Sequence, residues 1–319
     1  MKPASLLAIC VGAALLLGFF SAASAQEIQQ KADENHIAIS IDGKPFTDYW
    51  FGKRPDRPYV RPFFFPVLAA DGTPVTADHY GQKEHPHHNS LWVGQGDVNG
   101  ADHWDLGLGA KQPKQRHIRF ERMGGDTIVE DLEWESKKHE PMLRERRTMK
   151  FIAFADHSRG IEFTLEFTPI DGPVTFGDTK EAGLVAIRMN DQIPHDHPVL
   201  TNSTGAHTEK KTWGKAADWC DISGQIDGKE YGIAAMDSPQ NPRHPTRWHV
   251  REYGLLAANP FGLSYFDKGT PKHAGDFVMQ PGKTTAFKYL VLVHEGDAAS
   301  AHLQEKYKEF AGQTNTNSR

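Results

Sequence analysis

The chain has 319 residues, with 36 Lys and Arg against 41 Asp and Glu, and a formal net charge of −5 at pH 7. This balance leaves no strongly basic surface, which argues against a nucleic-acid partner and against binding to a membrane surface. The length is enough for one large β domain or two small ones.

Residues 1–25 have the pattern of a secretory signal peptide. Lys2 is the only charged residue before Gln26, residues 6–20 form an almost unbroken apolar run, and Ala23-Ser24-Ala25 offers a small-residue cleavage site. We therefore expect a periplasmic or secreted protein that begins at Gln26 and has no membrane span after signal removal. Losing Cys10 would leave Cys220 as the sole cysteine, which excludes an intramolecular disulfide.

Strand patterns dominate the rest of the chain. The stretch "HIAISIDGKPFTDYWF" alternates apolar and polar residues around Asp42-Gly43, which predicts a β-hairpin. Alternating runs of the same kind follow: "TIVEDLEWES", "RTMKFIAFA", "IEFTLEFTPI", "GLVAIRM", "GIAAMDS" and "TTAFKYLVLVHE". Their β-branched and aromatic residues recur at period two, which is typical of half-buried strands.

A single helix is expected near the end, over residues 298–310, with Asp297 as its N-cap. The chain lacks internal repeats and flexible linkers. These features predict an all-β fold, a large twisted antiparallel β-sandwich with a short C-terminal helix. It would form a single domain over residues 26–311, followed by a disordered tail at 312–319. Two smaller β domains are the alternative.

The first candidate site is the segment "EHPHHNSLWVGQGDVNG", which begins at Glu84. His85, His87 and His88 precede an apolar run and are therefore expected on a loop that enters a sheet. On an extended chain His85 and His87 face one side and His88 the other, so we expect at most two of them to share a site easily unless the chain bulges there. Such rings bind metals or transfer protons. The alternative is that they bond to carbonyl groups and fix the loop.

Three further clusters combine charged, imidazole and aromatic groups. "FGDTKEAGLVAIRM" carries Asp178, Lys180 and Glu181; a charged turn before a strand is the alternative there. Residues 197–219 and 237–254 add histidine, arginine and tryptophan side chains, namely His207, Arg243, Trp248 and His249. Such donors suit an anionic or heavily hydroxylated ligand. Tryptophans beside polar loops suit the C–H face of a sugar ring, although most tryptophans simply pack in cores.

Several motifs taken together resemble a known family. "RPFFFPVLAADGTPVT", "HPHHNSLWVGQGDVNG", "VTFGDTKEAGLVAIRM", "NSTG", "WGKAADWCDISG" and "NPRHPTRWHVREYGLLAANPFG" resemble a bacterial family of unknown function whose members often carry the label "PmoA family protein". The resemblance runs from about Arg54 to about Glu295. "RPFFFPVLAADG" followed by "HPHHNSLW" is also loosely similar to galactose-mutarotase-like proteins. That likeness implies a twisted β-supersandwich, the fold of aldose epimerases and of some glycoside hydrolases and lyases.

The leading hypothesis is a carbohydrate-active enzyme that acts on a sugar or modified sugar by glycosidic cleavage, elimination or epimerisation. His87 or His88 would be the general acid or base, and Glu181 or Asp178 its carboxylate partner. The substrate-binding residues would be His85, Trp92, Lys180, His207, Arg243, Trp248 and His249, with Trp92 or Trp248 stacking on the sugar.

Two alternatives stay open. One is a non-catalytic sugar-binding module. The other is a metalloprotein that uses His85, His87 and a distant histidine, His207 or His249. The sequence requires no cofactor and is compatible with a divalent metal ion. In each case we expect the clusters at 85–104, 176–189, 207–219 and 243–251 to converge on one concave face of the sandwich.

Overall fold

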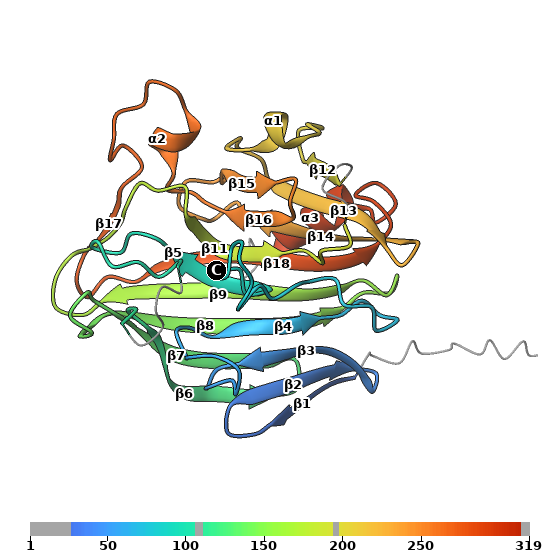
Figure 1. Cartoon of the computed structure of the whole chain (residues 1–319), viewed down its shortest axis with the longest axis horizontal. Coiled ribbons are helices and arrows are strands. Elements are labelled where there is room, and N and C mark those ends of the chain that lie inside the picture. The colour runs from blue at the N-terminus through green and yellow to red at the C-terminus, as the bar shows by residue number, and fades with distance from the viewer. Residues whose placement is uncertain (1–26, 106–110, 194–197, 314–319) are drawn as a thin grey trace, which may run out of the picture.

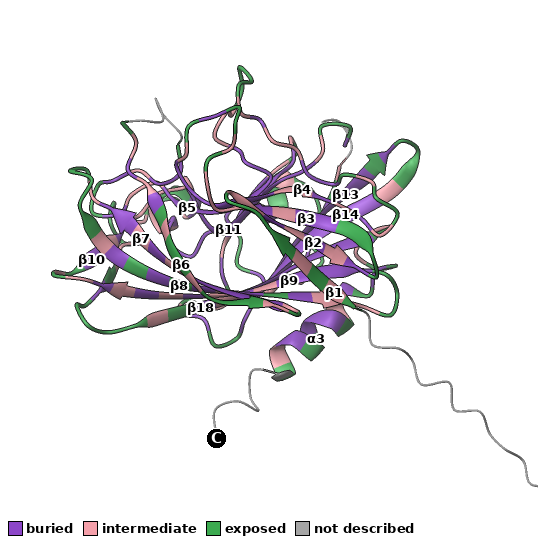
Figure 2. Cartoon of the chain, turned by 90° about the horizontal axis from the view of Figure 1, so that it is seen from below, coloured by how far each residue is buried: buried purple, intermediate pink, exposed green. Residues whose placement is uncertain are grey.

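Two antiparallel eight-stranded sheets form the two layers of the molecule (Figures 1 and 2). The computed structural model describes residues 27–105, 111–193 and 198–313. The first sheet has the order β1 (Ile28–Ala32), β2 (His36–Ile41), β3 (Lys44–Trp50), β4 (Phe63–Val67), β5 (Leu91–Gln95), β11 (Ala182–Arg188), β16 (Leu255–Ala258) and β15 (Trp248–Arg251).

The second sheet has the order β12 (Val199–Asn202), β13 (Trp219–Ile226), β14 (Lys229–Asp237), β18 (Thr285–Glu295), β9 (Arg159–Pro169), β8 (Pro141–Ala153), β7 (Thr127–Glu135) and β6 (Gln115–Gly124). Two short strands, β10 (Val174–Phe176) and β17 (Phe277–Met279), pair at one side. The predicted all-β antiparallel sandwich is thereby confirmed.

The predicted hairpin at Asp42-Gly43 joins β2 and β3. Both turn residues have positive φ, 51° at Asp42 and 72° at Gly43, as a two-residue hairpin turn of type I′ requires. Each of the other alternating runs also lies in a strand, from β7 to β18. Period-two patterning therefore located these strands correctly.

The core lies between the facing sides of the two sheets. On β9, Ile161, Phe163, Leu165 and Phe167 all point into it, each no more than 2% exposed. Burying a side chain of this kind stabilises the fold by about 1.5–3 kcal/mol. Because side chains alternate along a strand, the neighbours of core residues on the first sheet project from its outer face.

The helices are α1 (Glu209–Thr212), α2 (Leu263–Phe266) and α3 (Leu303–Gln313). Helix α3 begins five residues later than predicted, because His302 has a positive φ of 52° that interrupts helical geometry. Asp297 accepts the Ser300 N–H and so caps the preceding turn. Leu303 and Phe310 of α3 pack against β14 and β18 on the outer face of the second sheet (Figure 2).

The predicted signal peptide at 1–25 lies outside the described residues. Of the predicted tail, Gly312 and Gln313 belong to α3 and the remainder also lies outside. Within the described part of the chain, no helix combines the length and apolar character that crossing a membrane requires. Cys220 is a buried free thiol.

Candidate functional site

The outer face of the first sheet carries an aromatic floor. Trp92 on β5 points away from the core that its neighbours Leu91 and Val93 enter, and it packs against Trp104 with ring centroids 5.3 Å apart. Small residues on the adjacent strands, Ala186 on β11 and Ala257 on β16, complete this apolar cluster. Their short side chains leave room above the sheet.

A pocket of about 400 Å³ lies on this floor. It draws side chains from three separate parts of the chain, and its lining residues are His85, His87, His88, Asp102, Trp104, Asp105, Lys180, Glu181, His249, Arg251 and Tyr253. The predicted site residues His85, His87, His88, Lys180, Glu181 and His249 thus meet here. The volume falls in the range typical of small-molecule sites.

The three clustered histidines share the pocket, and the expectation that at most two would do so is wrong. The chain is not extended there: the His88 N–H donates to the His85 carbonyl at 3.0 Å, which closes a turn around Pro86 and His87. His85 also has a positive φ of 51°. As a result, one ring nitrogen from each of the three residues lies within 4.8 Å of the other two.

Arg61 fixes the histidine turn from below. Arg61 is 3% exposed, and its guanidinium donates to the His87 carbonyl at 2.7 Å, to the Trp104 carbonyl at 2.9 Å and to the Asn89 side chain at 3.0 Å. Burial lowers the pKa of Arg61 to about 9, so it stays charged at neutral pH. One buried cation thereby ties together two loops that line the pocket.

Burial makes the imidazoles of the pocket neutral at pH 7. It lowers the pKa of His87 to about 4, against the raising effect of Asp105, and that of His249 to about 4, against the raising effect of Glu181. The pKa of His85 is lowered as well, and that of His88 is driven far below its usual range. Neutral imidazoles can accept a proton or bind a metal ion.

Carboxylates and cations surround these rings. Glu181 pairs with Lys180 at 3.0 Å between Oε1 and Nζ, and both side chains are about 40% exposed to the pocket opening. Asp105 lies 3.7 Å from Nδ1 of His87. Burial raises the pKa of Asp102, whose Oδ1 accepts the Trp104 N–H at 2.8 Å.

Two aromatic rings form the walls. Trp104 is nearly buried and lines the pocket beside the histidines. Tyr253 sits in the turn between β15 and β16, which the Gly254 N–H closes on the Arg251 carbonyl at 2.9 Å. The Tyr253 ring stacks on His85, with centroids 4.7 Å apart and planes 19° apart. Burial raises its pKa to about 12, so its hydroxyl remains a proton donor.

Two of the predicted tryptophans do not reach the pocket opening. Trp92 is 2% exposed and lies under His88, so it belongs to the floor. Trp248 points into the core because it alternates with His249 along β15, and its Nε1 donates to the Ala217 carbonyl at 2.9 Å.

Three other predicted residues lie outside the pocket lining. Asp178 accepts the backbone N–H groups of Ser264 and Gly275 and so fixes two loops. Arg243 donates to the carbonyls of Gly275 and Asp276. His207 is exposed, 3.2 Å from the Thr201 hydroxyl. Three of the four clusters supply lining residues. The segment 207–219 supplies none and instead supports the pocket from outside, since Glu209 pairs with Arg251 and the Trp213 ring lies beside Arg251 and His249.

Five lining residues are absent from the set of site residues predicted individually, although three of them lie within the clusters predicted to converge: Asp102, Trp104, Asp105, Arg251 and Tyr253. Arg251 carried a usable signal, since it follows His249 by two residues and so shares its face of β15. Tyr253 carried none, because its position depends on the turn that closes at Gly254.

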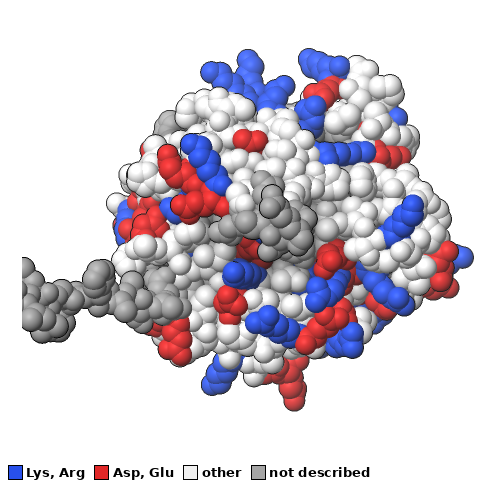
Figure 3. All heavy atoms as spheres, turned by 180° about the vertical axis from the view of Figure 1, so that it is seen from behind, with Lys and Arg blue, Asp and Glu red and all other residues white. Residues whose placement is uncertain are grey.

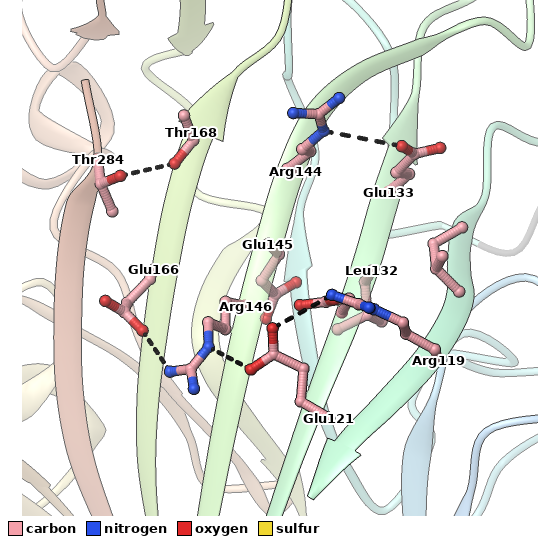
Figure 4. A pocket seen from close by; sticks show the side chains of 12 residues that line it. Arg119, Glu121, Leu132, Glu133, Arg144, Glu145, Arg146, Glu166, Thr168 and Thr284 are labelled. Carbon is pink, nitrogen blue, oxygen red and sulfur yellow. Dashed lines mark hydrogen bonds and ion pairs between the residues drawn. The ribbon is translucent and has the colours of Figure 1, made fainter. Parts of the chain in front are cut away.

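A larger depression, of about 530 Å³, lies on the outer face of the second sheet (Figure 4). Its charges pair across strands: Arg146 bonds Glu121 at 2.8 Å and Glu166 at 3.1 Å, and Arg119 bonds Asp131 at 2.7 Å. The rear of the molecule mixes acidic and basic side chains in the same way (Figure 3). Charges that neutralise one another on an open surface do not make a site.

Comparison with known proteins gives a family and no activity. The model of a family of unknown function, DUF6807, matches residues 36–308. The chain belongs to this family. The name PmoA does not appear for this family, so the likeness to proteins that carry that label stays a resemblance. No curated protein matches the chain in sequence.

Solved structures show only distant likeness. A GalM/aldose epimerase homologue from C. elegans matches with 8% identity and a TM-score of 0.35, over 86% of this chain and 100% of that chain. A polysaccharide lyase matches with 12% identity and a TM-score of 0.31, over 86% of this chain but 33% of that one. Likenesses of this extent carry no argument about what this chain does.

Proposed function

We propose that this protein is an exported enzyme that acts on a sugar or a related polyhydroxylated small molecule by acid–base proton transfer. The observation that carries the proposal is the meeting of Glu181 with His87 and His249 in one aromatic-walled pocket. These residues come from three distant parts of the chain.

The walls of the pocket suit a sugar ring. Tyr253 offers a partly exposed aromatic face that packs against C–H groups, and the buried Trp104 supports the apolar lining beside it. Asp102 and Asp105 accept hydrogen bonds from hydroxyl groups, while Lys180 and Arg251 donate them. A volume of about 400 Å³ holds a mono- or disaccharide-sized ligand.

Proton transfer needs a base and an acid on the same ligand. His249 is neutral at pH 7, and Glu181 is the strongest charged influence on it. The Tyr253 hydroxyl, protonated throughout the physiological range, is a proton donor at the same pocket. Glycosidic cleavage, elimination and epimerisation all require such a pair. The sequence-based assignment of proton transfer to His87 or His88 stays a prediction, with His87 the better placed because His88 is 1% exposed.

A substrate screen tests the proposal. The wild-type protein is incubated with neutral, acidic and keto sugars and their oligosaccharides, and products are detected by mass spectrometry and NMR. We expect turnover of one class and a loss of about 100-fold or more in kcat for Glu181→Gln, the usual size of an acid–base contribution. Glu121→Gln, the same change in the depression of the second sheet, keeps wild-type turnover.

Two results would count against the enzyme. If no sugar in the panel is changed by the wild type, the catalytic proposal fails. If a sugar binds equally well to wild type and to Glu181→Gln and is never changed, the chain is a binding module.

A further inference from the structure

The turn of His85, His87 and His88 brings three imidazoles close together at one side of the pocket. One nitrogen from each ring lies within 4.8 Å of the chosen nitrogens of the other two. Three ligands of a tetrahedral ion, each about 2.0–2.1 Å from it, are about 3.4 Å apart, so these nitrogens need to approach one another by at most about 1.4 Å. The turn itself needs no change, since Arg61 and the His85–His88 hydrogen bond already fix it.

One of these rings has an unmet polar atom. Nδ1 of His88 has no hydrogen-bond partner among the described residues. The residue is 1% exposed, so bulk water does not reach this nitrogen either. Leaving such a group unsatisfied costs about 1–3 kcal/mol, so a buried orphan nitrogen calls for an explanation. A ligand bound at the histidine turn would give the His88 ring a new polar contact, which would offset this cost.

We propose that His85, His87 and His88 bind one first-row transition-metal ion, for which Zn²⁺ is the natural candidate. Imidazole nitrogen suits this class of ion, and three protein ligands with an open fourth position are typical of catalytic zinc sites. The ligand set differs from the one expected from sequence, since His88 takes the place of a distant histidine. His207 lies outside the pocket.

The ring planes say which histidine moves. An ion lies in the plane of each imidazole that binds it. The planes of His85 and His88 are 3° apart with centroids 4.7 Å apart, so one of them turns on binding, whereas His87 is perpendicular to both, at 89°. His85 is the more exposed of the parallel pair and rotates away from its stack on Tyr253.

The surroundings balance a divalent charge. Asp105 lies 3.7 Å from His87, and Asp102 and Glu181 line the same pocket.

This inference rests on the proposed function only in sharing its pocket. With His87 and His88 bound to the ion, proton transfer falls to Glu181, His249 and Tyr253. The ion would then face a bound sugar hydroxyl or carbonyl oxygen as a Lewis acid.

Metal titration of protein purified without an affinity tag tests the site. After chelator treatment and dialysis, Zn²⁺ is titrated by calorimetry, and Cu²⁺ is titrated by quenching of Trp92 and Trp104, whose rings lie 5.5 and 6.2 Å from that of His88. We expect one ion per chain. His87→Gln and His85→Gln each weaken binding by about 100-fold or more, and His207→Gln leaves it unchanged.

Two results overturn the site: less than one ion per chain, or unchanged affinity in both His85→Gln and His87→Gln. Circular dichroism of each variant separates loss of a ligand from loss of the fold. Metal binding without turnover of any sugar would refute the proposed function alone. Turnover of a sugar by fully chelated protein that binds no metal would refute the metal site alone.

Discussion

The two sheets each carry a polar depression on their outer face, and the two depressions differ in how their polar groups are satisfied. On the second sheet, the exposed Arg146 lies between Glu121 and Glu166 and pairs with both carboxylates (Figure 4). On the first sheet, neutral imidazoles are buried on a tryptophan floor, and Nδ1 of His88 has no hydrogen-bond partner among the described residues.

How the polar groups are satisfied distinguishes the two depressions as binding sites better than their volumes do. The depression on the second sheet is larger, at about 530 Å³ against about 400 Å³, yet its charges already satisfy one another. Exposed ion pairs contribute about 0–1 kcal/mol each and leave little for a ligand to gain. Buried groups with unmet bonds and perturbed pKa values are the more specific mark of a binding site.

The largest expected effect is a difference in stability between variants of two arginines, one beneath each depression or within it. Arg61→Met removes bonds to three carbonyls and to Asn89, and we expect it to lower the free energy of unfolding by about 3 kcal/mol or more, because buried acceptors lose their donor. Arg146→Met in the exposed network should cost less than about 1 kcal/mol. Urea unfolding of both variants measures the contrast, and equal losses would contradict it.

An aromatic wall should contribute to affinity for the sugar identified in the screen. Tyr253→Leu removes the ring beside His85, and we expect about two- to tenfold weaker binding, in line with the about 0.5–1.5 kcal/mol typical of an aromatic contact. Tyr265→Leu makes the same change in α2, where Tyr265 is 51% exposed and outside the pocket. Calorimetry compares the two; equal affinities would remove Tyr253 from the site.

A smaller effect concerns the segment that precedes the histidine turn. His79 and Arg188 hold Asp191 through hydrogen bonds, which lower its pKa to about 2 from 3.8. Because the folded-state pKa is depressed, the stabilisation is present above about pH 4 and is lost as the pH falls towards 2. Asp191→Asn should lack this acid-dependent part. Unfolding curves between pH 2 and about 6 test it; a wild-type–variant difference independent of pH would contradict the assignment.

Much of the fold was predictable from the sequence, because strand alternation and the Asp42-Gly43 turn are local signals. The same alternation would have placed Trp248 in the core, opposite His249, had it been applied to β15. The histidine turn was misjudged because a loop was treated as an extended chain. The roles of Asp178 and Arg243 in holding distant loops depend on tertiary contacts that no local pattern encodes.

We expect the ligand to bind on the outer face of the first sheet. Hydrogen exchange with and without the sugar that the wild type turns over locates it, because one experiment reports on both depressions. We predict slower exchange confined to the backbone around His85–His88, Lys180–Glu181 and His249–Tyr253. Slower exchange around Arg119 and Arg146 instead, with none at the histidine turn, would contradict the account.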